Sequence, residues 1–196
     1  IMQKLTERVE KLTLPAIAMR GIVVFPHIVT SFEIARKQSV KALKCAEEGD
    51  GRIFLVAQDD PSVLEPTAKD LQTVGVIARI DHSFKLPNGN IQVIAEGLTR
   101  AELHSLVQRG NGLETTVFVR DIEYETLDIT LQLEAMKYAW AALTEYLKYT
   151  PNRSKEITDS ARAINEAGTL ADFLASSFLV KAEDRQAVVD IYHPID

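Results

Sequence analysis

The sequence predicts an α+β protein with a β-rich N-terminal lobe, residues 1–124, followed by an all-helical C-terminal lobe, residues 125–196. The spacing of apolar residues changes near Glu125. Before that point, short runs rich in Val, Ile and Phe alternate with Gly, Pro and Asp, which is typical of strands joined by turns. After it, apolar residues recur at steps of three and four, which indicates helices. Because the two spacings bury different kinds of face, we expect separate cores joined around residues 121–128.

Seven apolar runs of the first lobe are predicted to be strands because turn-forming residues bound each of them. They are Thr13–Met19, Ile22–Phe25, Ile28–Ile34, Ile53–Gln58, Val74–Phe84, Ile91–Glu96 and Thr116–Ile122. Pro87–Asn90 contains Asn-Gly, which supplies the positive φ angles that a two-residue hairpin turn requires. Gln38–Glu48 is predicted to be a helix. Leu98–Arg109 fits either a strand or a helix, and the alternation of apolar with polar residues favours a strand.

The second lobe begins with a long predicted helix that ends before Pro151. Its residues Ile129, Leu133, Met136, Trp140, Leu143 and Leu147 form one continuous apolar face. Ser154–Glu166 repeats the pattern, and Gly168 is expected to close that helix. Thr169–Asp172 resembles a capping box, with Asp in place of the usual Glu or Gln, that opens a helix through Leu179. A short helix, Glu183–Tyr192, completes the lobe.

A second apolar stripe runs along the side of the long helix opposite Trp140. It consists of Leu127, Leu131, Tyr138, Ala142 and Tyr149. The structural interpretation is that both stripes are buried in packing contacts. The functional interpretation is that the second stripe is partly exposed and contacts unfolded chains or a neighbouring subunit, as exposed apolar patches often do. Tyr suits this role because it joins a broad apolar ring to a polar tip.

Composition and charge exclude several classes of function. The chain of 196 residues has a net charge of -6, from 28 acidic and 22 basic residues, which repels nucleic acid. A basic cluster on the first helix, Arg36, Lys37, Lys41 and Lys44, is the local exception. Cys45 is the single cysteine, so neither an internal disulfide nor a four-thiolate zinc site can form. Because no apolar run approaches the ~20 residues of a membrane helix, we expect a soluble, cytoplasmic protein without a membrane partner.

No constellation in the sequence supports catalysis. The patterns G-x-x-x-x-G-K-[ST], G-x-G-x-x-G, H-E-x-x-H and S-x-x-K do not occur. The four histidines are scattered, and none lies at helical spacing from another ligand that would complete a metal site. We therefore predict no catalytic, cofactor-binding or metal-binding residues, and expect the chain to hydrolyse neither ATP nor peptide bonds.

Six fragments follow one another along nearly the whole chain, from about Leu14 to the end. They are LPAIAMRGIVVFPHIV, RKQSVKAL, IFLVAQDDP, TVGVIARI, KLPNGNIQVIAEGLTRAEL and LADFLASSFLVKAEDRQAVVD. In this order they resemble the N-terminal domain of bacterial Lon, the ATP-dependent protease. The family commonly has Leu-Pro-Leu-Arg-Gly, whereas here Ala16–Met19 lengthens the interval between Pro15 and Arg20.

The resemblance implies a PUA-like lobe followed by a helical bundle. It implies a non-catalytic domain that recognises and delivers unfolded, damaged or tagged proteins and helps to assemble a homo-oligomer, a hexamer in the parent protease. ATP, magnesium and a Ser-Lys dyad belong to the other modules of that parent. By the same resemblance, Gly97 is expected to turn the chain between two strands, with Arg100 orienting the turn through hydrogen bonds.

Two functions of other classes stay open. One is a PUA-like nucleic-acid-binding module, which the acidic net charge opposes and which would depend on the basic cluster of the first helix. The other is a free-standing small-molecule-binding domain of the same fold. A well-formed apolar pocket with converging polar groups would favour that alternative.

Overall fold

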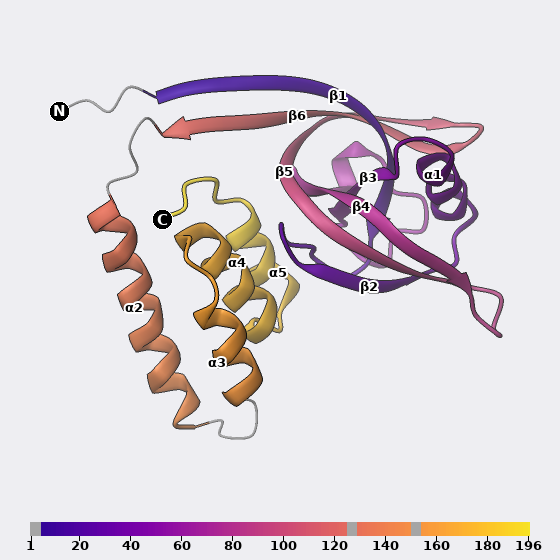
Figure 1. Ribbon diagram of the computed structural model, residues 1–196. Coiled ribbons are helices and arrows are strands. Elements are labelled where there is room, and N and C mark those ends of the chain that lie inside the picture. The colour runs from indigo at the N-terminus through magenta and orange to yellow at the C-terminus, as the bar shows by residue number, and fades with distance from the viewer. Residues whose placement is uncertain (1–4, 125–128, 150–153) are drawn as a thin grey trace.

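The computed structural model describes residues 5–124, 129–149 and 154–196, and it confirms the predicted α+β class (Figure 1). The N-terminal part of the chain forms strands with one helix and a short 3-10 turn, and the C-terminal part forms helices. In chain order the elements are β1 (Leu5–Met19), β2 (Val29–Ile34), α1 (Lys37–Glu48), β3 (Arg52–Ala57), η1 (Ala68–Asp70), β4 (Val74–Lys85), β5 (Ile91–Arg109), β6 (Gly112–Tyr124), α2 (Ile129–Leu147), α3 (Ser154–Arg162), α4 (Ala167–Phe178) and α5 (Ala182–Val189).

The strands form a closed barrel with one additional strand at its edge. The order along the sheet is β2-β5-β4-β3-β1-β6, and β5 also pairs with β6, which closes the ring. The long β1 runs antiparallel to β6 over residues 5–16 and then parallel to β3 over residues 16–19. The first half of β5 pairs with β2, and its second half pairs with β6. Closure satisfies the backbone groups that an open sheet would leave unpaired.

Two predictions about the strands around Gly97 are wrong, and both have the same cause. Ile22–Phe25 is irregular although Val23, Val24 and Phe25 are buried. Gly97 does not turn the chain, because β5 continues through it. The irregular segment crosses β5 so closely that a Cβ on Gly97 would lie 2.0 Å from the carbonyl oxygen of Phe25. Apolar spacing alone does not distinguish such a buried crossing from a strand.

The β4–β5 hairpin forms where Asn-Gly predicts it, but its loop is longer than two residues. Lys85 pairs with Ile91, and the amide of Leu86 donates to the carbonyl of Asn90 at 2.8 Å. Gly89 has a φ of 88°, whereas Asn88 does not have a positive φ. One positive-φ residue therefore suffices here, because the loop spreads the reversal over five residues, 86–90.

The boundary between α3 and α4 differs from the prediction. α3 ends at Arg162, and Gly168 lies inside α4 instead of closing the preceding helix. The carboxylate of Glu166 accepts hydrogen bonds from the amides of Gly168 and Thr169, at 2.9 and 2.6 Å, and so caps the first turn of α4. Glu166 thus does what the predicted capping box at Thr169 would have done.

The two lobes share a core, so the expectation of separate cores is wrong. Ala175 of α4 and Val189 of α5 belong to the same buried apolar cluster as Phe25, Leu43 and other residues of the β-rich lobe. The side-chain amide of Gln186 donates to the carbonyl of Val74 at 2.9 Å, which adds a buried hydrogen bond across the junction. α2 stands outside this contact, on the side of the helical lobe away from the barrel (Figure 1).

The predicted boundary between the lobes falls in a stretch that is not described. β6 ends at Tyr124 and α2 begins at Ile129, so residues 125–128 lie outside the described residues. Within the described ranges, no strand follows Tyr124.

Candidate functional site

The predicted second stripe of α2 is exposed wherever the structure describes it. Tyr138 and Tyr149 are 80% and 78% exposed, and Leu131 is 46% exposed. Ala142 is exposed as well, and Leu127 lies outside the described residues. The structural interpretation, in which both stripes are buried, is therefore wrong. α2 ends at Leu147, so Tyr149 lies in the turn after the helix and not on the helix itself, where the sequence had predicted it. We call Leu131, Tyr138 and Ala142, together with Tyr149 in this turn, the outer face of α2.

The opposite stripe of α2 is covered only in part, from the middle of the helix onwards. Leu143 is buried, and the ring of Tyr146 meets the ring of Phe178 edge to face, with centroids 5.2 Å apart. Ile129 and Leu133, in the first half of the helix, are exposed. α2 packs against α4, and this contact lies towards the C-terminal end of the helix. The exposed apolar surface of α2 is therefore larger than the sequence predicts, because it includes both sides of the first two turns.

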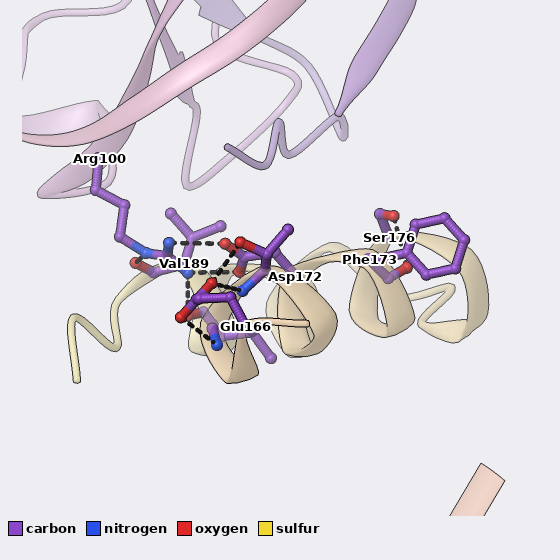
Figure 2. A network of polar contacts seen from close by, with 9 residues as sticks. Arg100, Glu166, Asp172, Phe173, Ser176 and Val189 are labelled. Carbon is purple, nitrogen blue, oxygen red and sulfur yellow. Dashed lines mark hydrogen bonds and ion pairs between the residues drawn. The ribbon is translucent and has the colours of Figure 1, made fainter. Parts of the chain in front are cut away.

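A buried ion pair joins the β-rich lobe to the helical lobe (Figure 2). The two guanidinium Nη atoms of Arg100, on β5, donate to the two carboxylate oxygens of Asp172, on α4, at 2.8 and 2.6 Å. Arg100 also donates to the carbonyls of Val189 and Val188 at the C-terminal end of α5, at 2.9 and 3.3 Å. A cation is favourable there because the carbonyls of the last turn carry partial negative charge. Arg100 orients two helices instead of the turn that the resemblance assigned to it.

The two acidic groups at this junction have opposite pKa shifts. Burial raises the pKa of Asp172 above its ordinary value, and the hydrogen bonds and charge of Arg100 offset this only in part. Burial acts in the same direction on Glu166, but the hydrogen bonds from Thr169 and Gly168 outweigh it and lower the Glu166 pKa. Both carboxylates are fully engaged by neighbouring donors, so the junction is a structural network.

A cavity of about 560 Å³ lies beside this network, between the lobes. Its lining includes His27, Arg100, Glu166, Asp172 and Tyr192. The hydroxyl of Tyr192 is buried without a hydrogen-bond partner within the described part of the chain, and burial raises its pKa. Arg100, Glu166 and Asp172 are occupied by one another or by backbone groups. The charged groups named here are therefore already paired within the protein, which does not favour the small-molecule alternative.

The side chains of the outer face of α2 were predicted from the sequence. The pairing of acidic residues at the junction was not. Arg100 and Asp172 are 72 residues apart and carry no local pattern that would join them.

Among the described residues, no group of three or more His, Cys, Asp or Glu side chains could hold a metal ion. No helix in the same residues is long and apolar enough to cross a bilayer.

Comparisons with known proteins agree with this architecture. A family model described as the ATP-dependent protease La (LON) substrate-binding domain matches residues 13–196. The Lon protease of Solibacter usitatus is 35% identical over 191 residues, which cover 97% of this chain and 23% of that protein. The Lon protease of Escherichia coli strain K12 is 33% identical over 185 residues, which cover 94% of this chain and 23% of that protein.

Two solved structures share the fold. The N-terminal domain of the Mycobacterium avium complex Lon protease superimposes with a TM-score of 0.70 at 20% identity, covering 93% of this chain and 92% of that one. The Lon N-terminal domain protein from Xanthomonas campestris gives a TM-score of 0.60 at 14% identity, with the same coverage of both chains. The fold is thus that of a Lon N-terminal domain.

The chain belongs to the family of Lon substrate-binding domains. It spans 23% of the length of the Lon proteases of S. usitatus and E. coli. The family model that matches residues 13–196 is described as a substrate-binding domain.

Proposed function

We propose that this chain recognises unfolded or damaged proteins for a Lon-type ATP-dependent protease, and that it captures them on the outer face of α2. The observation that carries the proposal is the exposure of Tyr138 on α2, at 80%, and of Tyr149 in the turn after it, at 78%, while α2 packs against α4 through the side that carries Leu143. Several large apolar side chains exposed along one element are typical of a surface that another molecule covers.

The chemistry of this face suits weak capture without sequence preference. Each Tyr ring can bury roughly 150 Å² against a partner, and at ~25 cal/mol per Å² the pair contributes several kcal/mol before the costs of association are subtracted. Those costs offset much of the gain. A partner would therefore bind weakly and could be handed on, as a degradation machine requires.

ATP hydrolysis and peptide-bond cleavage are proposed to belong to other parts of a Lon-type homo-oligomer, which the family resemblance implies to be a hexamer using ATP and magnesium. We propose that this chain acts in the cytoplasm of the cell, where its unpaired Cys45 would stay reduced. We expect the purified chain to turn over neither ATP nor an unfolded model protein. ATP hydrolysis that copurifies with the chain and disappears when one of its residues is replaced would contradict this assignment.

The proposal is tested with the double variant Tyr138→Ser/Tyr149→Ser. Binding of a labelled, permanently unfolded protein, measured by fluorescence anisotropy, should weaken at least roughly fivefold because both rings are removed from the contact. The matched control is Phe84→Ser/Val180→Ser, which removes exposed apolar side chains elsewhere and should bind like the parent. Unchanged binding by the α2 variant, with the control also unchanged, would refute the proposed site.

A further inference from the structure

A strongly basic pocket lies where α1 begins, on the β-rich lobe. It has a volume of about 470 Å³, and five cationic side chains line it: Arg20, Arg36, Lys37, Lys41 and Arg109. One carboxylate, that of the exposed Glu65, is in the lining. This concentration of positive charge stands out in a chain whose net charge is -6.

Most of these cations have no carboxylate partner. Within the described ranges, Arg20, Arg36, Lys37 and Lys41 form no ion pair, whereas Arg109 pairs with Glu114 at 3.1 Å. Lys41 donates to the carbonyl of Gly110 at 2.9 Å, which fixes the ammonium in the pocket without neutralising it. The positive charge of the pocket is therefore available to a ligand.

The local environment makes this charge unfavourable for the folded protein alone. Arg36 donates to the carbonyl of Ala18 and to the side chain of Gln58, which holds its guanidinium in a partly buried position. Burial, and then the nearby charge of Arg20, lower the Arg36 pKa. The first turn of α1 contains no acidic residue, so the partial positive charge of the helix end adds to the repulsion. An anion in the pocket would offset the repulsion from Arg20 and from the helix end, and it would compensate the partly buried charge of Arg36.

We infer that this pocket binds carboxylate side chains of an acidic protein segment, as a second recognition site for protein substrates. The inference rests on the proposed function and deepens it, because it adds an electrostatic contact to the apolar one on α2. The charges are complementary, and exposed Leu64 in the lining can contact apolar residues of the same segment.

An acidic peptide fits the pocket better than a nucleic acid does. None of the described residues that line it is aromatic, so no ring is present on which a base could stack. The cations lie in one pocket, whereas proteins that bind a single-stranded nucleic acid usually have a longer basic groove that follows its backbone. The acidic charge of the remaining protein also repels a long polyanion more than it repels a short segment.

The test uses a short labelled peptide of Asp, Glu and Leu, and a matched peptide in which Asn and Gln replace the acids. We expect the acidic peptide to bind and the amide peptide to bind at least roughly tenfold more weakly, with the difference shrinking at high salt. Lys37→Gln/Lys41→Gln should weaken the acidic peptide roughly tenfold, because two unpaired cations are lost. Arg36 is left intact because it holds backbone and Gln58 contacts.

The control Lys44→Gln/Lys85→Gln removes the same charge from exposed positions outside the pocket and should bind like the parent. Equal binding of the two peptides, or no loss in Lys37→Gln/Lys41→Gln, would overturn the inference. A single-stranded oligonucleotide that binds more tightly than the peptide, and is lost in the same variant, would overturn it in favour of nucleic acid.

The two proposals fail separately in this design. Tyr138→Ser/Tyr149→Ser should lose the unfolded protein and retain the acidic peptide, which supports both assignments. If the parent binds the unfolded protein through α2 but not the acidic peptide, the pocket assignment alone is refuted. If the parent binds the peptide but Tyr138→Ser/Tyr149→Ser binds the unfolded protein as tightly as the parent does, the α2 proposal alone is refuted.

Discussion

The side chains of the lobe junction and those of the outer face of α2 lie in opposite environments, the first buried and the second exposed. At the junction, Asp172 is 3% exposed and both of its oxygens accept hydrogen bonds from Arg100. On α2, large apolar side chains extend into solvent. A buried charge destabilises the fold unless its hydrogen bonds are complete. An exposed aromatic ring costs the fold little, and covering it with a partner is favourable. The junction therefore fixes the arrangement of the lobes, and the α2 face is free to bind.

Removing the cation at the junction should have the largest effect on stability. Arg100→Ala leaves Asp172 buried without its partner, so we expect the free energy of unfolding to fall by about 3–5 kcal/mol. Urea denaturation followed by circular dichroism measures it. Arg79→Ala is the matched control, because Arg79 pairs with Glu96 near the surface and should cost less than about 1 kcal/mol. Equal losses in the two variants would show that the junction is not specially stabilising.

Replacing the buried residue of α2 should have the second-largest effect on stability. Leu143 is the buried residue of this helix, and Leu143→Ala should cost about 2–3 kcal/mol by removing apolar contacts and leaving a cavity. The same urea titration applies. Leu131→Ala, on the outer face, is the control and should stay within about 0.5 kcal/mol of the parent. A large loss for Leu131→Ala would mean that the outer face is also part of the core.

The cap of α4 should have a smaller effect that depends on pH. Glu166→Gln should cost about 1 kcal/mol at pH 7, because a charged acceptor is lost from the two amides of the first turn. The Glu166 pKa is lowered in the folded protein, so its stabilisation is present above the ordinary value of 4.5 and is lost as pH falls through the lower folded value. The stability difference between parent and variant should shrink below about pH 4. A difference that grows in acid would contradict this sign.

The outer face should have the smallest effect on stability. Tyr138→Ser/Tyr149→Ser removes side chains that are mostly in solvent, so the unfolding free energy should change by less than about 0.5 kcal/mol. Thermal unfolding of the variant and of the Phe84→Ser/Val180→Ser control should give similar midpoints. Unfolding of the α2 variant at a clearly lower temperature would show that these rings support the fold.

The sequence predicts which residues of α2 form its outer face, but it does not predict that this face is exposed. Residues spaced at helical intervals must share a side of the helix, so the stripe through Leu131 and Tyr138 follows from the sequence. Which side of α2 is covered depends on where α4 lies. Because both stripes are apolar, their composition does not decide it, and the structure shows that α4 covers part of the stripe with Leu143.

The sequence by itself determined that a β-rich part precedes a helical part, where the β4–β5 hairpin turns and that α2 has two apolar stripes, because these follow from local spacing and turn chemistry. The tertiary structure decided that Ile22–Phe25 crosses β5 at Gly97 and that Asp172 pairs with Arg100 instead of capping its own helix. It also gathered Arg20 and Lys41 into one pocket. Contacts between residues far apart in the chain depend on how the elements pack, and no local pattern encodes that packing.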